Sequence, residues 1–170
     1  MQSDWSSEPL EVVVGLGANL GDRRATLLSA LSALEALGRV VCVSALYENE
    51  ALGPPQPPFL NAAARLLTDL TPLELLEALL AIERNHGRVR RERWGPRTLD
   101  LDLLWGGCRI VEHPRLQLPH SELSRRTFAL RPLLDVAPAA SDPTTGKPYA
   151  ETLEVLDCSG LVRVGWRDRG

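Results

Sequence analysis

The chain has 170 residues, of which 44% are hydrophobic and 24% are charged, and its net charge is −3. This length and apolar content indicate one domain with a substantial core, and the charge is a weak argument against a general nucleic-acid binder. The sequence has no apolar run of membrane-spanning length, and its three cysteines are widely spaced without a C-x-x-C, which favours a reduced, cytoplasmic setting. We expect residues 1–9 to be a disordered lead-in and residues 10–170 to be a single domain.

The first half of the chain is predicted to alternate strands and helices. Apolar, β-branched runs predict strands, leucines at helical spacing predict a helix, and the four prolines of residues 48–58 predict a loop. The second helix has a sharp predicted start, because Thr71 and Glu74 form a capping box with Pro72 at the first helical position. The predicted elements are strands at 12–16, 39–47 and 59–67, a helix from Asp22 to Gly38 and a helix from Thr71 to His86.

The second half is predicted to add one longer strand, at 98–105, and several short elements. Residues 108–111 are expected to pair with that strand as a hairpin. The order strand–helix–strand occurs twice in the chain, which predicts an α+β sandwich of ferredoxin-like type, with helices packed on an antiparallel sheet. The later predicted elements are a loop or short turn at 119–126, a short helix ending before Pro138, a turn at 142–146 and a strand at 161–166.

Residues 97–106, RTLDLDLLWG, place two carboxylates inside this apolar strand. Because side chains alternate along a strand, the leucines at odd positions share one face. Asp100 and Asp102 share the other face, about 7 Å apart along the chain, and Leu104 continues it. One interpretation is an amphipathic strand with one solvent-exposed face. The other is a magnesium site, since Mg²⁺ binds one or two carboxylates together with waters and substrate phosphate oxygens.

Six arginines crowd into residues 84–97, just before the two carboxylates. A solvated run of charge is one interpretation, and a phosphate-binding loop is the other, since guanidinium groups bind phosphate in bidentate geometry. Arg97 lies three residues before Asp100, where a phosphate-binding cation and a metal-binding carboxylate would act on one transferred group. The sequence has no G-x-x-x-x-G-K-[ST] motif, so ATP chemistry here is not of the P-loop type.

GLGANLGD, residues 15–22, is predicted to be a glycine-rich turn between a strand and a helix. It imitates a dinucleotide-binding turn, in which backbone amides receive phosphate. The strand that follows ends at Glu48, however, beyond the usual spacing of a ribose-binding acid. Glycines that permit a tight turn are therefore the favoured interpretation, and Asn19 is the one polar side chain there that could face a ligand.

Two phenylalanines form the last candidate site. Phe59 and Phe128 could sandwich a flat heterocycle while the amide of Asn61 binds its edge. Taken alone, each phenylalanine is more often a core residue. The two phenylalanines therefore indicate a ligand site only in combination with the other motifs.

The pattern G-P-R-x-x-D-[apolar]-D-[apolar]-[apolar] is satisfied at every position from Gly95 to Leu104. With this signature and its flanking blocks in order, the sequence resembles the 6-hydroxymethyl-7,8-dihydropterin pyrophosphokinase family of folate biosynthesis. The resemblance extends over nearly the whole chain. The flanking blocks are GLGANLGD, FLNAA, ERNHGRVR, LPHSELSRRTFALRPL and DPTTGKP.

The resemblance implies a ferredoxin-like pyrophosphokinase domain with three mobile loops. It also implies an ATP-dependent diphosphotransferase that moves the β,γ-diphosphate of ATP to the hydroxymethyl group of the dihydropterin and releases AMP. Two Mg²⁺ ions are the implied cofactors, with ATP as co-substrate. We expect a cytoplasmic monomer with no nucleic-acid or membrane partner.

The resemblance further implies roles for individual residues. The implied metal ligands are Asp100 and Asp102, which form the catalytic group with Arg88, Arg90 and Arg97. The implied pterin contacts are Asn49, Leu52, Phe59, Asn61, Trp94 and Phe128. The implied ATP contacts are Glu83, Arg90, Trp94, Arg97, Arg115, His120 and Arg126.

The sequence departs from the family pattern in two places. The usual Y-x-T-x-P-x-G loop appears as residues 47–53, where Asn49 and Ala51 replace threonine and proline. Ser121 follows His120, where some members have an aromatic residue. These positions bear on the pterin pocket and the adenine pocket, respectively.

Two other functions remain as alternatives at this point. A ferredoxin-like RNA-binding module could use the arginine-rich loop on phosphates, but it should carry paired aromatics on its central strands, and the aromatic content is only 5%. A dinucleotide-dependent reductase would rest on residues 15–22 alone.

Overall fold

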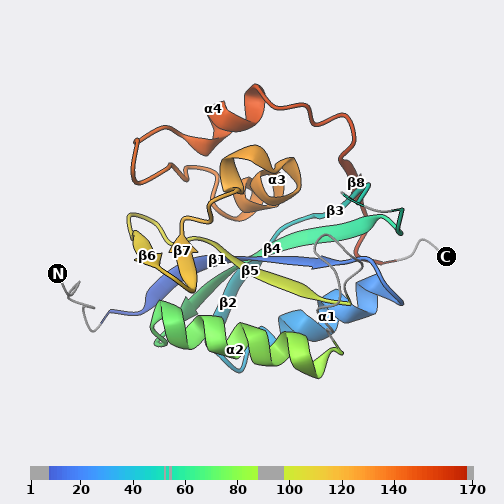
Figure 1. Cartoon of the computed structure of the whole chain (residues 1–170), viewed down its shortest axis with the longest axis horizontal. Coiled ribbons are helices and arrows are strands. Elements are labelled where there is room, and N and C mark those ends of the chain that lie inside the picture. Colours follow the sequence, from blue (N-terminus) through green and yellow to red (C-terminus); the bar gives the residue numbers. More distant parts are fainter. Residues whose placement is uncertain (1–7, 52, 54, 88–97, 168–170) are drawn as a thin grey trace.

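The computed structural model describes residues 8–51, 53, 55–87 and 98–167 (Figure 1). The main sheet has six strands in the order β5-β1-β4-β3-β8, and β2 pairs with β4. The strands are β1 (Leu10–Ala18), β2 (Arg39–Val43), β3 (Leu46–Asn49), β4 (Phe59–Thr68), β5 (Asp100–Trp105), β6 (Val111–His113), β7 (Leu116–Leu118) and β8 (Val162–Val164). The helices are α1 (Arg23–Leu34), α2 (Pro72–Asn85), α3 (Thr127–Val136) and α4 (Tyr149–Glu154), with a 3-10 turn at Leu123–Arg125.

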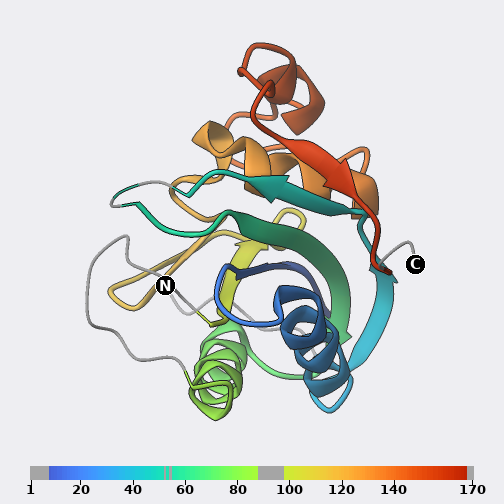
Figure 2. The ribbon, with the colours of Figure 1, turned by 90° about the vertical axis from the view of Figure 1, so that its right-hand side faces the viewer.

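The sheet has the interleaved antiparallel order of a ferredoxin-like sandwich, which confirms the predicted fold class. β4 lies between β1 and β3, and β1 lies between β4 and β5, all in antiparallel pairs. The units β1-α1-β2 and β4-α2-β5 each carry their helix over the same face of the sheet (Figures 1 and 2). Helix α3 packs on the opposite face, so helices cover the sheet on both sides.

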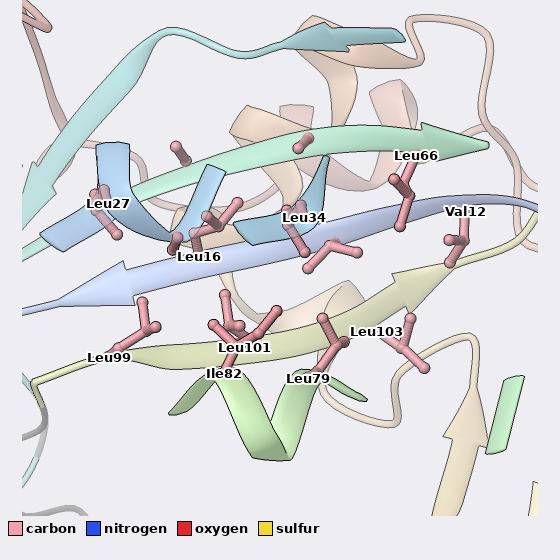
Figure 3. Packing of buried hydrophobic residues seen from close by; sticks show 14 of the residues in the cluster. Val12, Leu16, Leu27, Leu34, Leu66, Leu79, Ile82, Leu99, Leu101 and Leu103 are labelled. Carbon is pink, nitrogen blue, oxygen red and sulfur yellow. The ribbon is translucent and has the colours of Figure 1, made fainter. Parts of the chain in front are cut away.

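Each face of the sheet has its own hydrophobic core. On the face of α1 and α2, Leu27 and Leu79 belong to one cluster with the even-numbered residues of β1 and with Leu101 and Leu103 of β5 (Figure 3). On the other face, Leu130 and Leu133 of α3 pack with Leu104 of β5. Truncating a fully buried leucine such as Leu130 to alanine costs about 2–5 kcal/mol of stability, so α3 belongs to the folded core and its position is fixed.

The helix boundaries follow from local chemistry. Asp22 caps α1 by accepting the Ala25 N–H at 3.1 Å, and the predicted capping box of α2 is present, with both of its hydrogen bonds formed. Helix α1 ends at Leu34, before the predicted stop at Gly38. The chain tightens there, because Leu37 N–H bonds to the Leu34 carbonyl at 2.9 Å.

The predicted strand at 39–47 is two strands, β2 and β3, separated at Ser44 and Ala45. The Ala45 N–H donates to the Asp135 carboxylate of α3 at 3.2 Å, and the Ser44 hydroxyl accepts from Ala63 N–H at 2.8 Å. Side chains thus take hydrogen bonds that a continuous ladder would use. Strand β3 also extends to Asn49, into the segment predicted to be a loop.

The predicted hairpin between 108–111 and the long strand is wrong. A turn at Gly106–Arg109, with Gly107 at φ 69°, ends the strand, and β6 pairs with β7 instead. The six-residue helix α4 was not predicted. Residues 1–7 of the expected lead-in lie outside the described residues, and β1 begins at Leu10. In the described part of the chain, no helix has the length and apolar character needed to cross a membrane.

Candidate functional site

A pocket lies on the face of the sheet that α3 covers, and five elements contribute to it. Its lining combines polar side chains of three strands with the start of α3. Among the predicted site residues it brings together Asn49, Phe59, Asn61, Asp100, Asp102, Arg126 and Phe128. Its other lining residues are Gly15, Leu16, Gly17, Ala62, Leu104 and Ala129.

The glycines of β1 form the floor of this pocket. In the antiparallel register Gly17 pairs with Asn61 on one side and Asp100 on the other, and Gly15 pairs with Asp102. A Cβ at Gly17 would lie only 3.1 Å from Asn61 Oδ1, so the missing side chain keeps a path open between the two polar flanks. The predicted turn begins later, because Gly15 and Gly17 lie within the strand and the positive φ of this segment, 66°, is at Gly21.

The register also sets the distance across the site. Asn61 and Asp100 belong to the same cross-strand row, with one strand between them. Because neighbouring strands lie about 4.8 Å apart, their backbones are about 10 Å apart. A small flat ligand bound at Asn61 would therefore extend over Gly17 towards the carboxylates.

The two carboxylates occupy the pocket face of β5, as the alternation predicts. Both are partly buried, whereas Leu101 and Leu103 are 5% and 3% exposed in the core beneath the sheet. Leu104, which continues the carboxylate face, is only 3% exposed and packs under α3. This face is therefore not solvent-exposed along its whole length.

Glu83, predicted to contact ATP, is 2% exposed near the end of α2 and does not line the pocket. Its Oε1 accepts the Leu101 N–H at 2.9 Å. Leu101 stands between the two aspartates in the chain, so this buried bond fixes the backbone that carries them. A contact between Glu83 and nucleotide remains a prediction.

The aromatic end of the pocket lies between β4 and α3. Phe59 and Phe128 both line it, and the guanidinium of Arg126 lies 5.7 Å from the centre of the Phe128 ring. The Asn61 side chain is buried, and its amide donates to Asn49 Oδ1. The predicted combination of two rings and an amide is therefore present in one place.

His120 lies beside the pocket without lining it. Its backbone N–H donates to the Leu104 carbonyl at 2.8 Å, and its Nδ1 accepts the Glu122 N–H at 3.1 Å. Burial, reinforced by the nearby Arg126, lowers the pKa of His120, while Asp100 and Glu122 act in the opposite direction. A neutral ring whose Nδ1 accepts a hydrogen bond carries its proton on Nε2.

The structure does not bring every predicted residue to the pocket. Arg115 is exposed between β6 and β7 and forms an ion pair with Glu77 of α2. Asn19, suggested to face a ligand, is buried and donates to Gln56 Oε1 at 2.9 Å and the Pro57 carbonyl at 3.0 Å. Predicted site residues outside the described residues are Leu52, Arg88, Arg90, Trp94 and Arg97.

Sequence reasoning missed the floor of the pocket. The signal was available, because Gly15 and Gly17 have the same parity in an apolar run and would face the same side of a strand. Asn19 and Arg23 add a second missed feature, since Arg23 donates to the Pro58 carbonyl at 2.8 Å. These bonds anchor the chain immediately before Phe59.

The chain is thus an α+β protein with a ferredoxin-like sheet and a polar pocket on the face opposite α1 and α2 (Figure 2). The model of the 7,8-dihydro-6-hydroxymethylpterin-pyrophosphokinase (HPPK) family matches residues 13–138. A 2-amino-4-hydroxy-6-hydroxymethyldihydropteridine pyrophosphokinase of Synechocystis sp. is 42% identical over 161 residues, covering 94% of this chain and 83% of the relative. The enzyme of that name from Pseudomonas aeruginosa is 47% identical over 156 residues, covering 90% of this chain and 96% of the relative.

Solved structures agree on the fold. A Plasmodium falciparum HPPK-DHPS triple mutant with pteroate superposes with a TM-score of 0.71 at 14% identity over 94% of this chain. The match spans 47% of that longer chain. The chain therefore belongs to the 7,8-dihydro-6-hydroxymethylpterin-pyrophosphokinase family. It is an ATP-dependent pyrophosphokinase of folate biosynthesis, and neither the RNA-binding nor the reductase alternative is supported.

Proposed function

We propose that the pocket over Gly15 and Gly17 is the place where diphosphate passes from ATP to 6-hydroxymethyl-7,8-dihydropterin. The observation that carries this proposal is the single cross-strand row Asn61–Gly17–Asp100. It sets a heterocycle-binding amide and a carboxylate about 10 Å apart over a floor without side chains. This spacing accommodates a pterin whose hydroxymethyl group points towards bound phosphates.

The pterin end of the site consists of Phe59, Phe128 and Asn61. The two rings bind the faces of the heterocycle, and the amide binds its polar edge. All three belong to the pocket lining, and Asn61 is only 6% exposed. A polar group of the ligand that is buried there without a hydrogen bond weakens binding by about 1–3 kcal/mol. The amide therefore contributes selectivity as well as affinity.

The phosphate end consists of Asp100 and Asp102, and Arg126, whose guanidinium lies over the Phe128 ring, is a further ATP contact in this proposal. Two partly buried carboxylates on one strand face fit Mg²⁺, which binds one or two carboxylates and completes its shell with waters and phosphate oxygens. Among the described residues no group of three or more metal-ligating side chains occurs, so phosphate oxygens would complete the shell. Bound Mg²⁺, two ions in this proposal, would neutralise charge on the triphosphate.

The residues of the chain act by orientation and charge compensation. The hydroxymethyl oxygen forms a bond to the β-phosphorus of ATP, and the bond between the β-phosphorus and the oxygen that bridges it to the α-phosphorus breaks. AMP leaves with that bridging oxygen, and the hydroxyl proton is released to solvent. No histidine, cysteine or lysine occurs among the described lining residues, so we assign no side-chain base. Holding the alcohol in line with the β-phosphorus can supply most of the acceleration. Arg88, Arg90 and Arg97 remain predicted phosphate ligands.

Incubation with ATP, Mg²⁺ and the hydroxymethyl-dihydropterin, followed by chromatography of the nucleotides, tests this proposal. AMP should form only when the pterin is present. ADP as the main product would instead show an ordinary kinase. Omission of the pterin is the matched control, because a phosphatase contaminant would hydrolyse ATP without it.

We also propose that the enzyme acts as a cytoplasmic monomer. The three cysteines are unpaired thiols, which suits a reducing compartment. Light scattering of the eluted protein would test the oligomeric state, and fractionation of cells would test the location. A mass of twice 18.7 kDa would contradict the monomer.

A further inference from the structure

Two carboxamides and a backbone carbonyl form a chain of hydrogen bonds at the edge of the pocket. Asn49 Nδ2 donates to the Glu50 carbonyl at 3.1 Å. Asn61 Nδ2 in turn donates to Asn49 Oδ1. Both asparagines line the pocket, and they lie on neighbouring strands, β3 and β4.

This chain of bonds has a direction. A carboxamide has an acceptor at one end and donors at the other, and rotation by half a turn exchanges the two with little change of shape. The Glu50 carbonyl can only accept, so it holds the donor end of Asn49 and leaves Oδ1 to receive Asn61. The amide of Asn61 is thereby drawn towards β3.

The other end of Asn61 faces the floor. Its Oδ1 lies 3.1 Å from the position that a Cβ of Gly17 would occupy, above the open backbone of β1. With its donor end directed to Asn49, Asn61 presents an acceptor to the pocket. A ligand edge with N–H donors can donate to that acceptor. A ligand carbonyl at the same place would set two acceptor oxygens against each other, with no hydrogen bond between them.

We propose that Asn49 is a positioning residue that fixes the polarity of Asn61 and thereby selects a 2-amino over a 2-oxo heterocycle. The inference rests on the proposed pterin site and assigns Asn49 a role through Asn61, in place of the direct pterin contact that the resemblance implies. Without the Asn49 acceptor, the Asn61 amide can rotate and donate to a 2-oxo group. Selectivity then falls, although the rings still bind the heterocycle.

The test compares 6-hydroxymethylpterin with 6-hydroxymethyllumazine, in which a 2-oxo group replaces the 2-amino group. Calorimetry without nucleotide gives the two dissociation constants and their ratio for each variant. In the wild type the pterin should bind at least about tenfold tighter, because a mismatched buried polar edge carries a large penalty. In Asn49→Ala the ratio should fall by about tenfold, towards equal binding.

Asn49→Asp is the comparison variant, since it keeps an acceptor of the same size next to Asn61 but loses the donor to the Glu50 carbonyl, and it should restore part of the ratio lost in Asn49→Ala. Phe59→Leu is the control for general damage, because loss of stacking weakens both ligands alike and leaves the ratio unchanged. MgATP binding to every variant checks that the rest of the site is intact. A ratio is insensitive to the fraction of protein that is folded, so a purely structural effect cannot imitate the expected change.

The binding ratios distinguish failure of this inference from failure of the proposed function. A wild-type ratio that survives in Asn49→Ala would overturn the inference while leaving the proposed function in place, as would equal losses for both ligands. A ratio in Asn49→Asp no higher than that in Asn49→Ala would also overturn it. Wild-type protein that binds neither heterocycle would refute the proposed function itself.

Discussion

Gly17→Ala should abolish most of the activity while leaving the fold intact. The added Cβ would lie 3.1 Å from Asn61 Oδ1 and 3.7 Å from Phe59 Cδ1. A ligand ring that rests on the Gly17 backbone would have to rise by about 1.5 Å, the length of one carbon–carbon bond. Because a misplacement of about 1 Å can cost about 100-fold in rate, turnover should fall by about two orders of magnitude. The affinity for the pterin should fall as well.

The stability of this variant should change by less than about 1 kcal/mol. An alanine in a strand gains about 0.5–1 kcal/mol from reduced backbone freedom of the unfolded chain, which offsets the close approach to Asn61. Urea unfolding, calorimetry with the pterin and AMP formation measure the three effects separately. Gly15→Ala is the contrast, because its Cβ would meet Leu104 at 3.0 Å and should lower stability by about 1–3 kcal/mol. Normal pterin affinity and turnover in Gly17→Ala would refute the assigned floor.

Three further expectations follow, two from the site and one from the buried Tyr47. Asp100→Asn should lower turnover by orders of magnitude and leave pterin binding without nucleotide unchanged, because it removes a charge from the proposed metal site; near-normal turnover would show that the carboxylate is not a ligand. Phe128→Ala should weaken pterin binding by about 1 kcal/mol or more and MgATP binding far less, and equal losses in calorimetry would make the ring structural. Burial and the hydrogen bond to Asp135 raise the pKa of Tyr47 above its unfolded value of 10.0, so the stability from this shift is fully present below that pH and is lost as pH rises through the folded pKa. Urea unfolding of Tyr47→Phe against wild type across this range should show a flatter decline, and identical slopes would exclude the linkage.

The sequence predicted those features of the fold that depend on neighbouring residues in the chain, such as strand alternation and helix capping. The alternation in β5 placed Asp100 and Asp102 on one face because period two is a property of the strand itself, and the Thr71 capping box marked the start of α2. The break in the predicted strand at 39–47 was not predictable, because Asp135, which accepts the Ala45 N–H, lies 90 residues away in the chain.

The difference between local patterns and contacts distant in sequence also explains which parts of the candidate site were predicted. Phe59, Asn61 and Phe128 were proposed as a heterocycle site from their residue types, and the family resemblance gave them their pterin roles; the structure places them in one pocket. The floor was misjudged as a turn, although the shared parity of Gly15 and Gly17 was a local signal. The extension of the strand to Gly17 depends on pairing with β4 and β5, both distant in sequence. Arg115 pairs with Glu77 on the exposed side of the β6–β7 hairpin, a contact that no sequence motif marks.

The bond between Glu83 and the Leu101 N–H links the proposed catalytic face of β5 to the correct register of the folded sheet. A slip of β5 by one residue would exchange its faces, placing leucines over Gly17 and burying both aspartates against α2. Burying unpaired polar groups there would cost several kcal/mol, a large part of the net stability of about 5–15 kcal/mol that a domain possesses. A misaligned strand would therefore appear in experiments as protein that fails to fold. Well-folded preparations should accordingly contain one population of sites, with a single active fraction.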